Sequence, residues 1–178
     1  MVFFIESEEE FALCPNCGEL LEYHSWVTRR LKDKAGKRSK YLIRVLKCIN
    51  TACPTKYHRE LPDIITPYKR YDTESIEEAI DTDNQNATVA ADESTIHRWR
   101  RWFKENIVNI MMSLKSVTDA NGDIAKTSSL ENPEQDRSKP MEIIKVIVSR
   151  RVKWLNETVR ILVNSSKWVF NRSAFLTG

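Results

Sequence analysis

The chain has 178 residues, of which 41% are hydrophobic and 30% are charged, and its formal net charge is only +3. No apolar run is long enough to cross a bilayer, and the apolar residues 2–5 lead into an acidic stretch, not into a signal-peptide cleavage site. We therefore expect a cytoplasmic protein with no membrane partner, built as one domain or as two small ones. The small net charge does not by itself indicate a nucleic-acid partner.

The first 13 residues begin apolar and become acidic. Their aromatic residues are expected to pack on the module that follows or to form a short strand beside it.

All four cysteines follow in two pairs, Cys14-Pro15-Asn16-Cys17-Gly18 and Cys48 with Cys53. Each pair is spaced as in a metal-binding turn, and two such turns together offer four sulfur ligands in the tetrahedron that Zn²⁺ prefers. The spacing predicts a zinc ribbon with a structural Zn²⁺ held by Cys14, Cys17, Cys48 and Cys53.

Other interpretations of the cysteines are weaker. Two disulfides are disfavoured because no signal peptide is recognisable and the cytosol keeps thiols reduced. A redox-active dithiol needs a strand–CxxC–helix context, which Pro15 and Gly18 do not favour. His58 is an alternative ligand, but four thiolates already close the site, so a packed or hydrogen-bonded histidine is the simpler expectation.

Between the cysteine pairs the sequence predicts a hairpin, with strands over Leu20–Val27 and Tyr41–Leu46 and a turn around residues 33–37. Residues 28–47 carry nine positive charges and one acid. Such a run is either a solvated, mobile hairpin tip or a surface that binds phosphates. The second interpretation assigns backbone contacts with nucleic acid to Arg29, Arg30, Lys37 and Arg38.

Residues 54–72 contain three prolines, which predict an ordered, non-helical connector. A helix then begins after an N-cap at Asp72 or Thr73, and a second helix begins after Asp92. Ile96, Trp99 and Phe103 follow the helical period and predict a buried seam. The polar face of this helix is expected to contact DNA as the recognition helix of a helix-turn-helix, through Glu93, Ser94, Thr95, His97, Arg98 and Arg101. An ordinary amphipathic bundle helix is the alternative.

The rest of the chain reads as a polar linker and a helix. The linker spans residues 117–140, and apolar residues at helical spacing over 141–163 predict one long helix. This helix is expected to pack on residues 107–114, on a second copy or on a larger protein. The complete expectation is an α+β protein with a zinc ribbon and connector at 1–71, a helix-turn-helix at 72–116, a linker at 117–140 and a C-terminal helical segment at 141–178.

The two cysteine pairs, the connector residues 57–71 and Ser94-Thr95-Ile96 with Arg98-Trp99 resemble an uncharacterised bacterial family that joins a zinc ribbon to a helix-turn-helix. That family is similar to the DNA-binding front halves of insertion-sequence transposases. The resemblance covers roughly residues 10–105 and implies zinc at the four cysteines and DNA contact by the helix that starts near Asp92. Such transposases continue into a catalytic domain with three spaced carboxylates, which we do not expect in the residues up to Gly178.

No P-loop, Gly-x-Ser-x-Gly or His-Glu-x-x-His motif occurs in the sequence, and a closed four-thiolate site leaves no position for activating water. We therefore expect a protein that is not an enzyme and has no small-molecule substrate. The expected function is binding of double-stranded DNA with structural Zn²⁺, in a mobile element or in transcription regulation. The alternative is an adaptor that binds a larger enzyme through the ribbon and the C-terminal helix; RNA binding by the hairpin is a third possibility.

Overall fold

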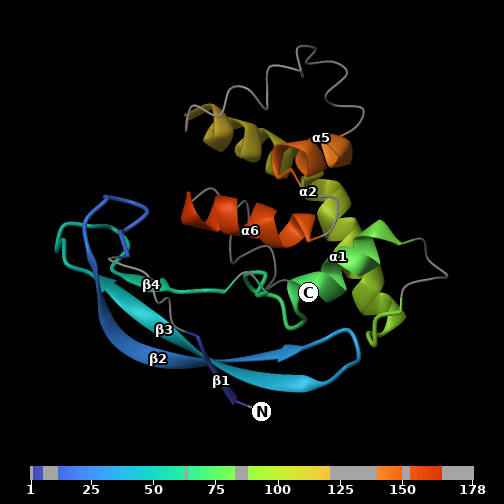
Figure 1. The fold of residues 1–178 in the computed structure, drawn as a ribbon, viewed down its shortest axis with the longest axis horizontal. Coiled ribbons are helices and arrows are strands. Elements are labelled where there is room, and N and C mark those ends of the chain that lie inside the picture. The colour runs from blue at the N-terminus through green and yellow to red at the C-terminus, as the bar shows by residue number, and fades with distance from the viewer. Residues whose placement is uncertain are drawn as a thin grey trace.

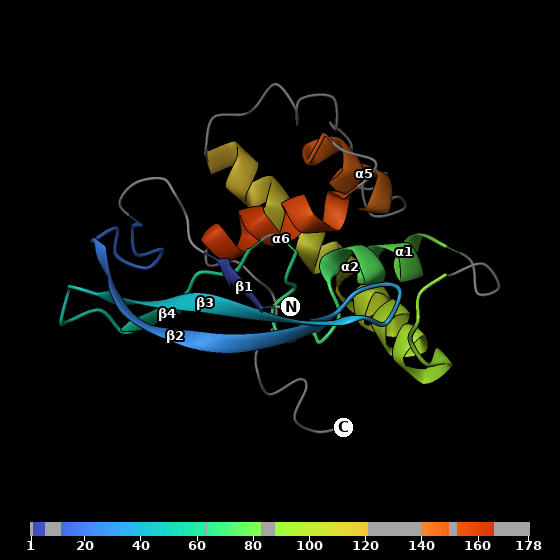
Figure 2. The same cartoon turned by 60° about the horizontal axis from the view of Figure 1, so that its bottom comes forward.

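The computed structural model describes residues 2–5, 12–62, 64–82, 88–120, 140–149 and 153–165. It confirms the α+β class, with a curved sheet beside a group of packed helices (Figures 1 and 2). The strands and helices, in chain order, are β1 (Val2–Ile5), β2 (Leu21–Lys32), β3 (Arg38–Cys48), β4 (Tyr57–Arg59), α1 (Thr73–Asp81), α2 (Glu93–Ala120), α5 (Pro140–Ile147) and α6 (Trp154–Asn164).

The hairpin of β2 and β3 is the longest feature of the sheet. It pairs antiparallel from Leu21 opposite Cys48 to Lys32 opposite Arg38, with a register shift between Tyr23 and Ser25. Both strands are longer than predicted. The ladder continues through residues 28–32 and 38–40, which the sequence analysis placed between the strands and the turn. The basic run is therefore regular β-structure almost to its tip.

Strand β3 lies in the middle of the sheet. β1 pairs with it in parallel at residues 40–43, and β4 pairs antiparallel at residues 45–47, both on the side opposite β2. β1 confirms one of the two predictions for the N-terminal residues, a short strand beside the hairpin. β4 lies inside the connector, which the prolines predicted to be ordered and non-helical; the strand itself was not predicted.

The connector links the hairpin to the helices. Leu31 and Ile43, on one face of the hairpin, pack against Ile65 of the connector, and all three are buried. The next connector residues run beside the end of β2, since Lys32 donates its amide to Arg70 and accepts from that of Asp72. The connector therefore positions α1 against the end of the hairpin that carries the β2–β3 turn, which we call its distal end or tip; the opposite end is the proximal one.

α1 and α2 begin directly after Asp72 and Asp92, the two residues that were predicted to cap them. The Asp72 carboxylate accepts from the Ser75 amide at 2.9 Å, and the Asp92 carboxylate accepts from the Thr95 amide at 2.7 Å. α2 runs to Ala120, so the predicted linker from residue 117 was wrong at its start: Val117 and Thr118 are buried in the helix. The remainder of that linker, 121–139, lies outside the described residues.

The prediction of one long C-terminal helix was also wrong. α5 and α6 are separate, and Ser149 and Lys153 beside the break have positive φ angles of 53° and 60°. The apolar residues of both helices join one core with those of α2. The apolar period in the sequence therefore does not reveal the break. Glu77 of α1 stabilises the start of α6, because its carboxylate accepts from the amides of Lys153 and Leu155 at 2.6 and 2.9 Å.

Among the residues with described structure, no helix combines the length and apolar character that crossing a membrane requires.

Candidate metal centre and basic hairpin

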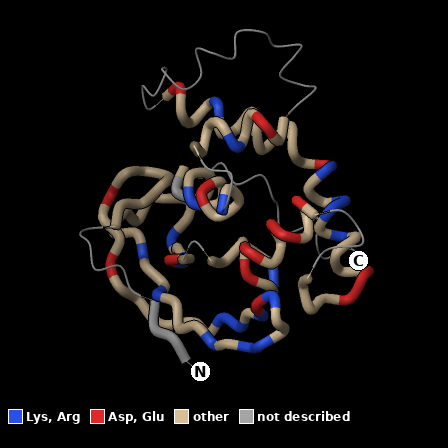
Figure 3. The backbone as a smooth tube through the Cα atoms, turned by 45° about the vertical axis from the view of Figure 1, so that its right-hand side comes forward, with Lys and Arg blue, Asp and Glu red and all other residues tan. Residues whose placement is uncertain are grey.

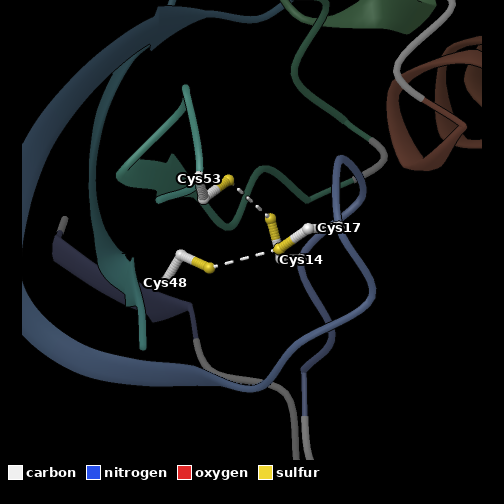
Figure 4. A group of neighbouring side chains, drawn as sticks. All are labelled: Cys14, Cys17, Cys48 and Cys53. Atoms are coloured by element: carbon white, nitrogen blue, oxygen red, sulfur yellow. Dashed lines mark hydrogen bonds between the residues drawn. The ribbon is translucent and has the colours of Figure 1, made fainter. Parts of the chain in front are cut away.

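The four cysteines converge at the proximal end of the hairpin, where Cys48 ends β3 (Figure 4). Their sulfur atoms all lie within 4.8 Å of one another. Cys14 and Cys53 are 3.7 Å apart at Sγ, and Cys17 and Cys48 are 3.6 Å apart. A tetrahedral ion with metal–sulfur bonds of about 2.3 Å would set sulfur–sulfur edges of about 3.8 Å. The geometry therefore suits a single metal ion, and all four thiols are free of disulfides.

Tight turns bring each pair into position. The Gly18 amide donates to the Cys14 carbonyl at 2.8 Å, and Gly18 has a φ of +75°, a conformation that glycine adopts without a steric cost. In the second pair, the Asn50 side chain accepts from the Ala52 amide at 2.9 Å and so folds the loop before Cys53. Local turn chemistry thus builds each half of the site, and the β2–β3 ladder brings the halves together.

The electrostatics of the cluster favour a bound cation. Burial opposes ionisation of Cys14, but hydrogen bonds from the backbone of Asn16 and Cys17 outweigh it and lower its pKa to about 6. Burial raises the pKa of Cys48 to about 12 and also raises the pKa of Cys53. Four thiolates this close repel one another, so full ionisation needs a positive ion among them.

His58 of β4 lies next to this cluster. Its Nε2 is 3.4 Å from the Cys14 sulfur and 3.0 Å from the Thr55 carbonyl oxygen. With the proton on Nε2, His58 donates to both atoms and is a hydrogen-bond partner of a ligand, as the sequence favoured. The pairing of β4 with β3, which the sequence did not predict, brings it there.

The hairpin residues predicted to bind phosphates fall into two groups. Arg30, Lys37 and Arg38 are exposed. Arg29 instead points to the connector face, is half-buried and donates to the Lys69 carbonyl at 2.9 Å. Burial lowers the pKa of Arg29, and the positive charges of Arg59 and Arg70 add to this effect. Its role in the structure is to hold the connector.

The exposed cations include one that the sequence analysis did not single out. Lys40 pairs with Arg30 across the hairpin, and both are exposed on one face. Figure 3 marks the lysine and arginine positions along the backbone. Among the described residues, no acidic side chain forms a salt bridge with Arg30, Arg38 or Lys40. We call Arg30, Arg38 and Lys40 the basic face. Strand alternation could have placed Arg29 and Arg30 on opposite faces, but the exposed face and the position of Lys40 depend on packing and register.

The predicted contacts on α2 are brought together on its first turns. Glu93, Ser94, His97, Arg98 and Arg101 are exposed, and Thr95 is half-buried. Two of the basic side chains lie along their own helix: Arg98 donates to the Thr95 hydroxyl at 2.9 Å, and Arg101 lies 3.9 Å from the Glu105 carboxylate. Hydrogen bonds from Ser94 and Thr95 lower the pKa of Asp92 to about 2, so this end of α2 also carries negative charge. The surface is mixed in charge, unlike the basic face.

The relation between α1 and α2 leaves the helix-turn-helix a prediction. That motif joins its helices by a turn of about three or four residues, whereas residues 82–92 separate α1 from α2. The two helices do pack together, because the Arg100 guanidinium donates to the carbonyls of Ala79 and Thr82 at the end of α1, both at 2.6 Å.

Over residues 14–99 the chain matches the model of a protein family described as a domain of unknown function (DUF6431). This range contains the cysteine cluster, the hairpin, the connector, α1 and the first turns of α2. Comparison with curated proteins and with solved structures finds no match.

Proposed function

We propose that this protein binds double-stranded DNA and that its cysteine cluster holds a structural Zn²⁺ ion. The observation that carries the proposal is the basic face, where exposed cations lie on one regular β-ribbon without acidic partners among the described residues. Cations held at fixed spacing bind phosphates and release the counterions of DNA. A closed site of four thiolates supports Zn²⁺ in a structural role, at the end of the hairpin away from its tip.

The position of α2 supports a second contact with DNA. The tip of the hairpin lies beside the segment that leads into α2 (Figures 1 and 2), and the Ala90 amide of that segment donates to the Lys34 carbonyl at the tip. We infer that the basic face holds the DNA backbone while the exposed start of α2 contacts bases, as in a helix-turn-helix. Regulation of transcription or of a mobile element is the role we propose.

The adaptor alternative has less support. It needs an apolar helix face for the partner, yet Ile144 of α5 and Leu155 and Leu162 of α6 are completely buried in the core of this chain. The described part of the C-terminal segment therefore uses its apolar stripe internally.

The first test measures affinity for a random-sequence duplex as a function of salt. In the zinc-replete full chain, Arg30→Ala/Arg38→Ala should weaken binding and reduce the slope of log K against log salt by about 2, because each variant residue leaves one phosphate without its cation. Lys104→Ala/Lys153→Ala is the charge-matched control, because both lysines are exposed outside the basic face. Equal effects of the two double variants, or binding that does not depend on salt, would contradict the proposal.

The second test concerns α2. Selection from a random duplex pool should recover a sequence motif, and Arg98→Ala should remove or relax it at a cost of about 1–3 kcal/mol in specific binding. Equal weakening on random DNA would instead assign Arg98 to phosphate.

A further inference from the structure

Two aromatic side chains extend the exposed face of the hairpin toward the metal centre. In β2, exposed Trp26, Thr28 and Arg30 alternate with half-buried Val27 and Arg29. Trp26 therefore lies on the same face as the cations, opposite Arg44 of β3. Tyr23 joins it across the register shift, with ring centroids 6.1 Å apart. Their exposed fractions, 37% for Trp26 and 57% for Tyr23, are high for large aromatic side chains.

We propose that this face binds single-stranded DNA, with bases stacked on Trp26 and Tyr23 and phosphates held by Arg30, Arg38 and Lys40. The inference rests on the proposed function and adds a second ligand, single-stranded DNA, to duplex DNA. Surfaces that bind single strands combine cations that follow the backbone with exposed aromatic rings. The hairpin carries both in one row.

The spacing of Trp26 and Arg30 and the charge along the hairpin face support single-stranded DNA as the ligand. Residues two apart on one strand face are separated by about 6.7 Å, so Trp26 and Arg30 lie about 13 Å apart, a span that a few nucleotides cover. Arg44, which faces Trp26, is neutralised by Glu60 through bonds of 2.6 and 2.9 Å. The row thus changes from cationic at the tip to aromatic near the bulge, which suits phosphates at one end and bases at the other.

Single-stranded DNA differs from duplex DNA in the exposure of its base faces. In a duplex the faces of the bases are stacked on one another, so the aromatic rings have no base to cover. An unpaired strand exposes those faces, and every base offers one, so stacking tolerates any sequence. The cations contribute to both ligands, whereas the aromatic side chains contribute only to the single strand.

The test uses the zinc-replete full chain with two labelled probes, an oligo-dT of about 20 nucleotides and a random duplex of the same length. Trp26→Ala should weaken oligo-dT binding roughly 5- to 150-fold and leave duplex binding unchanged, while Trp26→Phe should retain most of the affinity. Tyr57→Ala is the matched control, because Tyr57 is 54% exposed but contacts His24, outside this row. Arg30→Ala/Lys40→Ala should weaken both probes.

Tryptophan fluorescence gives an independent readout of stacking. Trp99, Trp102 and Trp154 are buried, and Trp168 lies outside the described residues, so the measurement uses a Trp168→Phe background. In that background oligo-dT should quench the Trp26 emission, and Trp26→Phe should abolish the quenching. Unchanged oligo-dT binding by Trp26→Ala overturns this inference but leaves duplex binding standing; failure of the duplex to bind overturns the proposed function itself. Tighter binding of oligo-rU than oligo-dT, or self-association that Trp26→Ala abolishes without an effect on oligo-dT, would also overturn it.

Discussion

The backbone amide of Ala90 donates a 2.7 Å hydrogen bond to the carbonyl of Lys34, and this contact joins the tip of the hairpin to the segment that leads into α2. The Lys34 side chain reaches α1 as well, with its Nζ 3.3 Å from the Glu74 carboxylate. Tyr71 of the connector packs edge-on against Trp99 of α2, with ring centroids 4.9 Å apart. Direct contacts therefore join the tip of the hairpin and the connector to α1 and α2.

Gly36 should be essential to this junction. It has a φ of +81°, and a Cβ there would lie 3.2 Å from the Ala90 Cβ. Gly36→Ala should lower the free energy of unfolding by about 2–3 kcal/mol, since the backbone conformation and the close approach both penalise the methyl group. Urea denaturation measures the change.

Gly18→Ala is the control for Gly36→Ala. Gly18 has a similar φ of +75° but no atom within 4 Å of a Cβ, so its substitution in the presence of excess Zn²⁺ should show a conformational cost without a steric clash. Ala90→Gly should relieve part of the cost of Gly36→Ala. An additive double variant would show that the close approach has no energetic consequence.

The cysteine cluster should bind one Zn²⁺ ion per chain. Zn²⁺ removal by a chelator should unfold the proximal hairpin and leave the helices folded, because the cysteine cluster and the helical core are separate apolar clusters. Hydrogen exchange would show reduced protection at Cys14, Cys48 and Cys53, with protection retained at Ile110 and Leu114. Loss of helical circular dichroism with the metal would contradict this separation.

His58 should stabilise the bound metal without ligating it. His58→Ala removes the hydrogen bond to Cys14 and should lower Zn²⁺ affinity about 10- to 100-fold, the usual effect of removing a partner of a metal ligand. Co²⁺ substitution should still give the absorption of four thiolates. His24→Ala is the control, because His24 is exposed and hydrogen bonds to Ser25. An altered Co²⁺ ligand set in His58→Ala would make His58 a ligand.

Glu77 should be a main determinant of the α1–α6 contact. It is only 8% exposed and accepts from two amides at the start of α6, so Glu77→Ala should cost roughly 1–3 kcal/mol by leaving those amides unsatisfied. Glu74→Ala, an exposed site on the same helix, should cost less than about 1 kcal/mol. Thermal unfolding that ranks the two variants in the opposite order would refute the assignment.

Lys69 should make the free energy of unfolding increase as the pH rises through the alkaline range. It is buried, with its Nζ 4.1 Å from the centre of the Trp102 ring. Burial, together with the positive charge of Arg98, lowers its pKa from 10.5 to about 8. The unfolded chain therefore holds the proton more tightly, and the folded state gains stability as the pH rises from about 8 to 10.5.

Lys69→Met tests this dependence. The difference in unfolding free energy between wild type and Lys69→Met should shift by about 1–2 kcal/mol in favour of wild type between about pH 7.5 and 9.5. Subtracting the variant removes the contributions of tyrosines and thiols. A difference that does not change with pH would mean that Lys69 keeps an ordinary pKa.

The sequence by itself determined the features that depend on neighbours along the chain. Cysteine spacing and Gly18 predicted the turn between Cys14 and Cys17, and Asp72 and Asp92 predicted the helix starts, because turns and caps are made by residues a few positions apart. It also determined the α+β class and the two core strands of the hairpin, through apolar and β-branched runs. These signals are local, so they survive without knowledge of the fold.

Only the tertiary structure decided which side chains are available and where the elements end. It turned Arg29 toward the connector, placed Lys40 beside Arg30, and brought His58 to Cys14 through β4. It also broke the C-terminal helix, since the amides at the start of α6 find their acceptor in Glu77, far away in the sequence. The physical reason is that burial and long-range pairing depend on register and packing, which composition and periodicity do not encode one segment at a time.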